Sequence, residues 1–256
     1  MDDRPLVSII TPTHNRERFL PLTYRCFQSQ SWPSLEWLVG DSSPVPSHFM
    51  SALHDERITY VHDRVSATRG EKRNALVARA SGAYIVHFDD DDYYSPQYIE
   101  QMVAAAMQSG ADLTKLSAFF LFNRLHNAYA YWDLMVKEGV HLAWTRDSLR
   151  ARTLTTQDWT SLTDNHLGFG FSYVYKRSVW DRERFSAMNW GEDIEFARRI
   201  DLKCPVRLFP DITGLCIHLL HDTNSSSCFP QFVIPEFLAL RMLPAAGDHF
   251  ALFGEI

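Results

Sequence analysis

Short apolar runs alternate with helix-like segments along the first 116 residues of the chain. The segment 19–27 places apolar residues at helical spacing, and further helices are predicted at 70–80 and 95–109. Strands that alternate with helices are typical of βαβ units, so we predict an α/β fold with a mostly parallel sheet flanked by helices. The runs that have the length and composition of strands are 6–10, 35–40, 58–61 and 84–88.

Capping and breaking residues indicate where the predicted helices begin and end. We expect Asn15 to cap the first helix, and Pro21 to lie in its first turn or to kink it. Ser81 and Gly82 are expected to end the second helix, and Gly110 the third.

Beyond residue 117 the alternation fades, and the sequence becomes aromatic-rich and irregular. We interpret this half as a cover over the carboxyl edge of the sheet, with most of its aromatic side chains in the core. A helix with acidic residues in its first turn is predicted at 190–199. The apolar tail 229–256 could pack on the body, form a dimer contact or touch a membrane, and packing is the default expectation.

Composition excludes some classes of partner. The net charge of -6 and the pI near 6.0 argue against nucleic acid, because phosphate binding needs a basic surface. The four cysteines show no C-x-x-C spacing, so we expect reduced thiols. Acidic residues open the chain and no window holds 18 uncharged apolar residues, so we expect a cytoplasmic protein, peripheral at the inner membrane face if the tail meets lipid.

Four consecutive carboxylates, Asp89 to Asp92, follow the apolar run 84–88 and form what we call the aspartate run. Four like charges in one loop repel each other, and a divalent cation or a set of hydrogen-bond donors among them relieves the repulsion. Ligands of open α/β sheets collect at the carboxyl ends of parallel strands, which is where this run lies. The alternative is a solvated acidic turn that caps the helix near Pro96.

Several short motifs follow one another over residues 6–100 in a specific order and spacing. Together they resemble family 2 glycosyltransferases of the GT-A fold, whereas the acidic motif alone would be weak. The motifs are Pro12-Thr13-His14-Asn15-Arg16, Asp41-Ser42-Ser43, Arg73-Asn74-Ala75, Gly82-Ala83-Tyr84-Ile85 and Asp89-Asp90-Asp91.

The resemblance implies roles for these residues around a nucleotide-sugar donor and a divalent metal, Mn²⁺ or Mg²⁺. Asp91 is the first choice for a metal ligand, and Asp89 and Asp90 would bind ribose hydroxyls or the metal through water. Asp41 would accept from a base N–H, which suits a UDP- or TDP-sugar. The other residues assigned to nucleotide-sugar binding are Pro12, His14, Asn15 and Arg73, although Arg73 could instead be a surface helix charge.

Two elements of the second half also resemble the family. Glu192 and Asp193 match an acidic pair that supplies the catalytic base of inverting members, with Asp193 as base and Glu192 on an acceptor hydroxyl. The alternative is that both serve only the helix dipole. His221 precedes Asp222-Thr223-Asn224-Ser225, a segment whose histidine can complete the metal or diphosphate site, but it could also be structural. His218, three residues earlier, is expected to face another way.

The sequence also departs from the family pattern. Gly40 stands where a second acidic residue is common, and His14 where an aromatic residue is common. We divide the chain into a nucleotide-sugar half (1–116), an acceptor and catalytic half (117–228) and the tail (229–256).

The predicted function is an inverting, metal-dependent glycosyltransferase that acts on a glycan, lipid-linked or other hydroxyl acceptor, possible as a homodimer. A metal-dependent nucleotidyltransferase is a rival, but it needs a glycine-rich basic loop after the first strand, and residues 12–18 contain no glycine. A non-catalytic binding module of the same fold is the third interpretation.

Overall fold

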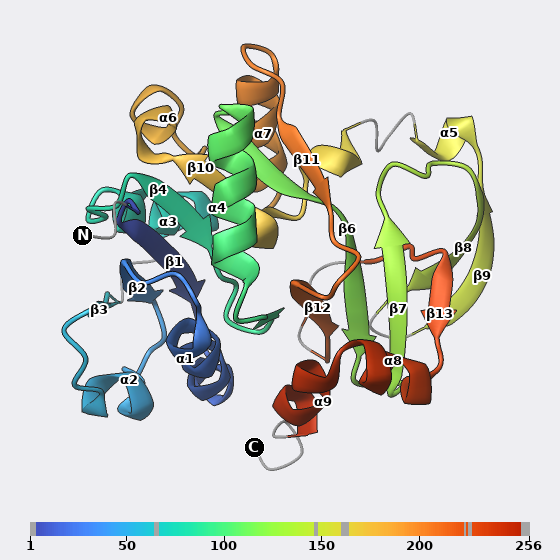
Figure 1. Ribbon diagram of the computed structural model, residues 1–256, viewed down its shortest axis with the longest axis horizontal. Helices are drawn as coiled ribbons and strands as arrows, with labels where there is room; N and C mark the ends of the chain where they lie inside the picture. Colours follow the sequence, from blue (N-terminus) through green and yellow to red (C-terminus); the bar gives the residue numbers. More distant parts are fainter. Residues whose placement is uncertain are drawn as a thin grey trace.

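The computed structural model describes residues 4–63, 67–145, 148–159, 164–222, 224 and 227–251. In these ranges the largest sheet contains 11 strands (Figure 1). They are β1 (Val7–Thr13), β2 (Leu35–Asp41), β3 (Ile58–His62), β4 (Tyr84–His87), β5 (Tyr93–Tyr94), β6 (Leu113–Asn123), β7 (Ala128–Asp133), β10 (Val174–Lys176), β11 (Arg207–Pro210), β12 (Cys216–Leu220) and β13 (Phe232–Ile234). Their order is β13-β7-β6-β10-β4-β1-β2-β3; β11 and β12 also pair with β6, and β5 pairs with β12.

The four strands predicted from the apolar runs form the parallel part of this sheet. β1 pairs in parallel with β2 and β4, and β2 pairs in parallel with β3. In the register, Thr13 lies opposite Asp41 and Ile10 opposite His87. The loops that follow β1, β2 and β4 therefore leave the sheet at the same edge.

Helices cover both faces of the sheet because the strand residues are apolar on both sides. Val7 and Ile9 pack in the core cluster that contains residues of α1 (Leu20–Ser29), α2 (His48–Ala52) and α4 (Tyr98–Ser109). Ile10 packs in the second cluster, with residues of α3 (Arg69–Val77), α6 (Arg177–Arg182) and α7 (Glu192–Asp201). The alternation along β1 thus assigns each helix group to one face.

Most predicted helix boundaries are confirmed within a few residues, with one exception. Pro21 lies in the first turn of α1, and Gly110 ends α4 in the left-handed region at φ 68°. The prediction that Asn15 caps the first helix is wrong. Asn15 itself has a left-handed backbone (φ 55°) and its N–H donates to Ser43 Oγ (2.8 Å), while the 3₁₀ helix Glu17–Phe19 precedes α1.

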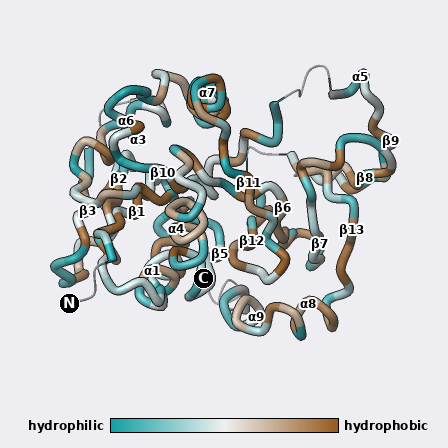
Figure 2. The backbone as a smooth tube through the Cα atoms, turned by 45° about the horizontal axis from the view of Figure 1, so that its top comes forward, coloured by the Kyte–Doolittle hydropathy of each residue, from teal (hydrophilic) through white to brown (hydrophobic). Residues whose placement is uncertain are grey.

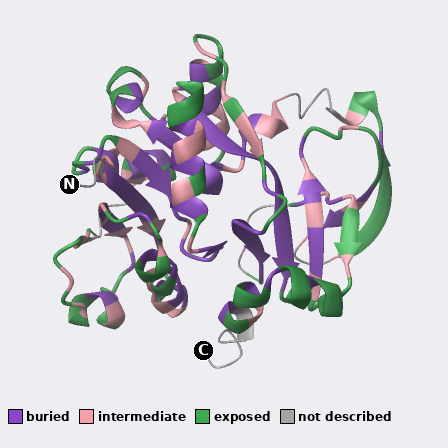
Figure 3. Cartoon of the chain, in the orientation of Figure 1, coloured by how far each residue is buried: buried purple, intermediate pink, exposed green. Residues whose placement is uncertain are grey.

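The second half is more regular than predicted. β6 has 11 residues, all buried, and its neighbours β7 and β10 pair with it in antiparallel fashion. A strand buried on both faces shows a continuous apolar run instead of alternation, which is why the sequence looked irregular here. The division expected at residue 116 falls inside β6. A separate hairpin of β8 (Gly139–Trp144) and β9 (Leu149–Leu154) projects beyond β7, with β9 largely exposed (Figure 3).

The C-terminal tail packs on the body over the residues described. β13 pairs with β7, and Ala239 and Ala246 are buried in the main core. Apolar residues of β13 and α8 nevertheless remain on the surface, as the brown segments there show (Figure 2). No helix in the described ranges has the length and apolar character to cross a membrane. The remaining helices are α5 (Thr156–Trp159), η2 (Asn165–Leu167), η3 (Gly170–Ser172), α8 (Glu236–Met242) and α9 (Pro244–Ala251).

Candidate active site

A cavity of about 840 Å³ lies at the carboxyl edge of the parallel strands. One wall comes from the loop after β1, the aspartate run and α3, and the other from residues 165–171, 189–194 and 218–229. The structure therefore joins residues from both halves of the chain in one site. The predicted residues that line it are Pro12, His14, Asn15, Arg73, Asp89, Asp90, Asp91 and Asp193.

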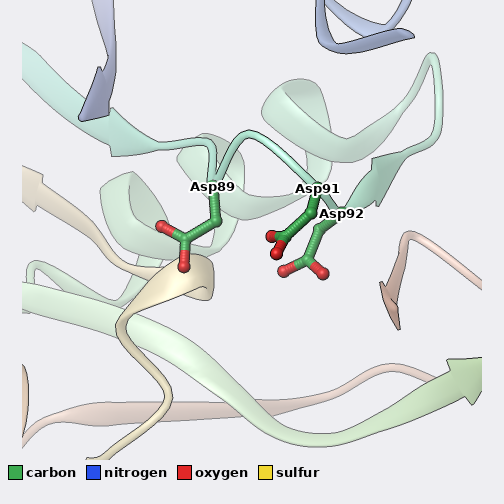
Figure 4. A group of neighbouring side chains, drawn as sticks. All are labelled: Asp89, Asp91 and Asp92. Carbon is green, nitrogen blue, oxygen red and sulfur yellow. The ribbon is translucent and has the colours of Figure 1, made fainter. Parts of the chain in front are cut away.

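Three members of the aspartate run form a group that fits a divalent cation. Asp89, Asp91 and Asp92 each offer a carboxylate oxygen, and these atoms lie within 4.8 Å of one another. All three side chains lie on the same side of the loop that leaves β4 (Figure 4). Hard divalent cations such as Mg²⁺ and Mn²⁺ prefer carboxylate oxygens, so the donor set suits the metal that the sequence predicts.

Asp90 faces the loop after β1. Its Oδ2 accepts a hydrogen bond from Thr13 Oγ1 (2.5 Å), and its Oδ1 lies 3.1 Å from Arg16 Nη1. The same Arg16 nitrogen also contacts Asp91 Oδ2. One guanidinium therefore neutralises part of the charge of two neighbouring carboxylates.

Both late histidines reach the aspartate run, so the expectation that His218 faces another way is wrong. His218 Nδ1 lies 2.9 Å from Asp92 Oδ1, and His221 Nε2 lies 3.0 Å from Asp91 Oδ2. β12 ends at Leu220, so the strand alternation stops before His221. His221 is 2% exposed beside the proposed metal ligands. Thr223 and Ser225 of the same segment lie outside the described residues.

Burial and charge separate the carboxyl groups of the aspartate run. Burial raises the pKa of Asp90 to about 7, and the charge of Asp91 adds to this effect. Burial likewise raises the pKa of Asp92, to about 6. At Asp91 burial acts in the same direction, but the hydrogen bond with His221 and the charge of Arg16 outweigh it and hold the pKa below its usual range. Asp91 is the member that stays most firmly ionised, as a metal ligand must.

Arg73 is a buried residue that connects the two walls. It is 3% exposed, its Nη2 lies 3.6 Å from Asp89 Oδ1, and its Nε lies 3.5 Å from Glu192 Oε1. Its Nη1 also contacts His87 Nδ1, at the end of β4. The alternative that Arg73 is a surface helix charge is therefore wrong.

Asp193 is held by backbone groups at the start of α7. Its Oδ2 accepts from Gly170 N–H (2.8 Å), and its Oδ1 accepts from Ile194 N–H (2.8 Å). A carboxylate can accept about four hydrogen bonds, so lone pairs remain for a substrate hydroxyl. Glu192, the neighbouring residue, is 1% exposed, and burial raises its pKa although Arg73 partly offsets this.

Asp41 lies 3% exposed at the end of β2. Its Oδ1 accepts from Ser43 N–H (2.8 Å), and its Oδ2 accepts from Tyr60 OH (2.7 Å). Asp41 lines a small hollow of about 100 Å³, and Lys72 lines both this hollow and the main cavity. His14, on the neighbouring loop, is exposed and its Nδ1 lies 3.0 Å from Ser42 O.

Sequence reasoning missed several residues of the site. Arg16 belonged to a recognised motif, so its contact with the aspartates could have been proposed. Asp92 was visible in the same run but received no role. No local signal pointed to Gly170, whose N–H meets Asp193 across 23 residues of sequence.

A sequence model of the family described as "Glycosyl transferase family 2" matches residues 8–165, more than half of the chain. The chain belongs to glycosyl transferase family 2. The matched range includes the loop after β1, β2, α3 and the aspartate run. The family resemblance predicted from these motifs is thus confirmed.

Curated relatives of this family 2 chain are similar over part of their length. It is 30% identical over 112 residues to the putative colanic acid biosynthesis glycosyl transferase WcaA of Escherichia coli (strain K12), covering 42% of this chain and 40% of the relative. It is 26% identical over 197 residues to the uncharacterized glycosyltransferase EpsJ of Bacillus subtilis (strain 168), covering 75% and 53%. The family 2 chain thus spans about half or less of the length of these two relatives.

Solved structures confirm the predicted fold. TarS of S. aureus in complex with UDP-GlcNAc superposes with a TM-score of 0.63 at 14% identity, covering 86% of this chain and 60% of that one. The mannosyltransferase PcManGT from Pyrobaculum calidifontis, in complex with GDP-Man and Mn²⁺, gives 0.59 at 17% identity, covering 85% and 57%. The family 2 chain therefore has the GT-A fold, a mixed α/β fold with helices on both sides of its sheet.

Proposed function

We propose that this chain is a metal-dependent glycosyltransferase that moves a sugar from a UDP- or TDP-sugar to an acceptor hydroxyl with inversion. The observation that carries the proposal is a single cavity with metal-binding carboxylates, Asp89 and Asp91, on one wall and Asp193 on the other. A single displacement needs these two functions on opposite sides of the reacting sugar carbon.

Asp89, Asp91 and Asp92 would hold the divalent ion, with His221 beside Asp91 as a further ligand. When bound, the ion would act as a Lewis acid that stabilises negative charge on the leaving diphosphate. Arg16 would keep the remaining carboxylate charge of Asp90 balanced while the donor binds.

The donor diphosphate also needs positive charge, and α3 supplies it. Arg69, Lys72 and Arg73 all line the cavity from this helix, at positions three and four residues apart. Asp41, next to Lys72 in the small hollow, would accept from a base N–H. This acceptor suits uracil or thymine; TarS binds UDP-GlcNAc whereas PcManGT binds GDP-Man, so the fold by itself does not select the base.

Asp193 would take the proton of the acceptor hydroxyl. The N–H groups of Gly170 and Ile194 orient its carboxylate, and the N-terminus of α7 favours the anion. Glu192 is buried against Arg73, so we now propose that it positions Arg73 and not the acceptor.

Calorimetry with UDP, TDP and GDP, each with Mn²⁺, Mg²⁺ or EDTA, tests the donor half of the proposal. We expect UDP or TDP to bind only with a divalent ion, and the matching nucleotide-sugar to release nucleotide slowly by hydrolysis. NMR of the product's anomeric configuration tests inversion. Preference for a nucleoside triphosphate would instead favour a nucleotidyltransferase, and failure to bind any nucleotide would favour a non-catalytic module.

A further inference from the structure

Three aromatic side chains line the part of the cavity that contains Asp193, and we call them the aromatic wall: Phe169, Trp190 and Phe229. Phe169 directly precedes Gly170, which binds Asp193, and Trp190 lies three residues before Asp193. The ring of Trp132 packs edge-on against both phenylalanines, with centroids 4.9 Å from Phe169 and 6.1 Å from Phe229. The two phenylalanines therefore belong to one supported surface.

The aromatic wall is only partly covered by the protein. Trp190 is 64% exposed, and Phe169 and Phe229 are half-buried. A single exposed tryptophan needs no explanation by itself. Three partly exposed rings that share a cavity with a carboxylate are different, because they form an apolar surface beside a polar reactive group.

The backbone at Phe169 supports a functional role for its ring. Phe169 has φ 63° and ψ 60°, in the left-handed region that phenylalanine rarely adopts. Such a conformation costs roughly 1–3 kcal/mol and is found mainly where the surrounding structure enforces it at a site. Here it lets Gly170 approach Asp193 while the Phe169 ring stays in the cavity wall.

Amide groups accompany the aromatic wall. Asn165 and Asn189 both line the cavity, and Asn189 Oδ1 accepts from Arg69 N–H (3.0 Å), which fixes the orientation of that amide. A sugar ring has an apolar face of C–H groups and a rim of hydroxyls. Aromatic faces attract the C–H groups, and amides bind the hydroxyls.

We infer that the acceptor is a carbohydrate whose terminal ring stacks on the aromatic wall, with its reacting hydroxyl at Asp193 and others at Asn165 and Asn189. This inference rests on the proposed function and assigns its acceptor class. A simple alcohol or alkyl phosphate fits less well. Among the cavity-lining residues in 165–171 and 189–194 none carries a positive charge, and the negative Asp193 would repel a phosphate next to the hydroxyl.

The test compares methyl glycosides of hexoses and N-acetylhexosamines with octanol and octyl phosphate as acceptors. The measurement is nucleotide release from the nucleotide-sugar that the wild type hydrolyses, with and without each compound. We expect at least one methyl glycoside to accelerate release. Trp190→Ala should raise the KM for that glycoside by about 10-fold, while UDP binding and hydrolysis without acceptor stay unchanged.

Trp190→Phe keeps an aromatic ring and should retain most of the glycoside affinity. Phe237→Ala is the matched control, because Phe237 is a comparably exposed aromatic residue (65%) on α8, away from the cavity lining. Binding of the glycoside should also change the tryptophan fluorescence of the wild type, and this change should be smaller in Trp190→Phe.

Acceleration by octanol or octyl phosphate and by none of the glycosides would overturn the inference. So would an unchanged glycoside KM in Trp190→Ala. Either result leaves the proposed function intact as long as metal-dependent UDP or TDP binding and donor hydrolysis persist. Absence of nucleotide binding in the wild type would contradict the proposed function itself.

Discussion

Arg16 lies where positive charge matters most, between Asp90 and Asp91. Burial opposes its charge, but the two carboxylates outweigh this effect and raise its pKa. Arg16 is therefore a permanent cation beside the proposed metal ligands. It reduces the repulsion within the aspartate run before any metal binds, so the run can fold into a compact loop.

Asp91→Asn tests the metal site at a single residue. It keeps the shape of the side chain but removes the charge that a divalent ion needs. We expect metal-dependent UDP affinity, measured by calorimetry with Mn²⁺, to fall by more than about 100-fold, because even second-shell partners of metals are worth 10- to 100-fold. Transfer should be lost.

Asp112→Asn is the control for this variant, because Asp112 pairs with Lys176 and Arg182 outside the cavity lining. Undiminished activity of the wild type in excess EDTA would contradict the role of the metal.

Asp193→Asn tests the general base. We expect turnover to fall by about 100- to 10,000-fold, as on removal of a general base, while donor affinity changes little. The new amide must turn its NH₂ toward one backbone N–H, of Gly170 or Ile194, so a small drop in melting temperature is also expected. Near-normal turnover would show that the carboxylate only stabilises α7.

At the level of elements, the turn Phe169–Phe171 positions the start of α7. A Cβ atom on Gly170 would lie 2.7 Å from Asp193 Cβ, closer than real contacts allow. We expect Gly170→Ala to displace Asp193 and to lower kcat by about 100-fold, the effect of a misplacement near 1 Å, with UDP affinity unchanged.

Gly168→Ala is the matched control, because its nearest neighbour, Asn165 O, would lie 3.4 Å away. Steady-state kinetics on both variants separates the two positions. Equal losses in both would mean that the whole loop is sensitive and that the close approach to Asp193 is not the cause.

β6 contains a buried lysine that ties the sheet to the same wall of the cavity. Lys115 is fully buried, and its Nζ donates to the carbonyl oxygen of His166 in η2 (2.5 Å). Burial lowers the pKa of Lys115 to about 7, although the charge of Asp193 partly offsets it. The unfolded chain binds this proton up to its ordinary value near 10.4, whereas the folded chain releases it near pH 7.

Between about pH 7 and pH 10 the unfolded state therefore binds more protons at Lys115, and the wild type gains stability as pH rises. Relative to Lys115→Met, its free energy of unfolding should increase by up to about 1.4 kcal/mol per pH unit over this range, measured by denaturant titration. Lys203→Met, at an exposed lysine, should show no such trend. A constant difference for Lys115→Met would mean that the ammonium stays charged when buried.

At the scale of the whole molecule, the sheet joins the two walls of the cavity. β4 carries the aspartate run and pairs directly with β1 and β10, while β10 also pairs with β6. The nucleotide-binding edge and the acceptor side thus share one hydrogen-bonded scaffold. A ligand that contacts both walls should stabilise the fold as a unit.

UDP and Mn²⁺ added together should therefore raise the melting temperature. At 100 times the dissociation constant, binding stabilises the native state by about 2.7 kcal/mol, or roughly 5–10 °C for a chain of this size. Differential scanning fluorimetry with UDP alone, Mn²⁺ alone and both provides the comparison. EDTA should abolish the joint shift, and a shift with UDP alone would contradict metal-dependent binding.

The sequence by itself determined the features that depend on local physical chemistry. Strand periodicity located β1 to β4, and the order of those strands and helices predicted the parallel α/β core. The acidic first turn of α7 and the left-handed Gly110 followed from capping rules. Asp91 could be placed at a strand end for the same reason, because the apolar run before it is unambiguous.

Only the tertiary structure decided which distant residues meet. His218 reaches Asp92 across 126 residues of sequence, and Arg73 meets Glu192 because α3 and α7 cover the same face of the sheet. Such contacts depend on strand order and register, to which no single segment contributes enough signal. The antiparallel strands of the second half were missed for a related reason: they are buried on both faces, so their pattern carries no periodicity that distinguishes them from irregular core.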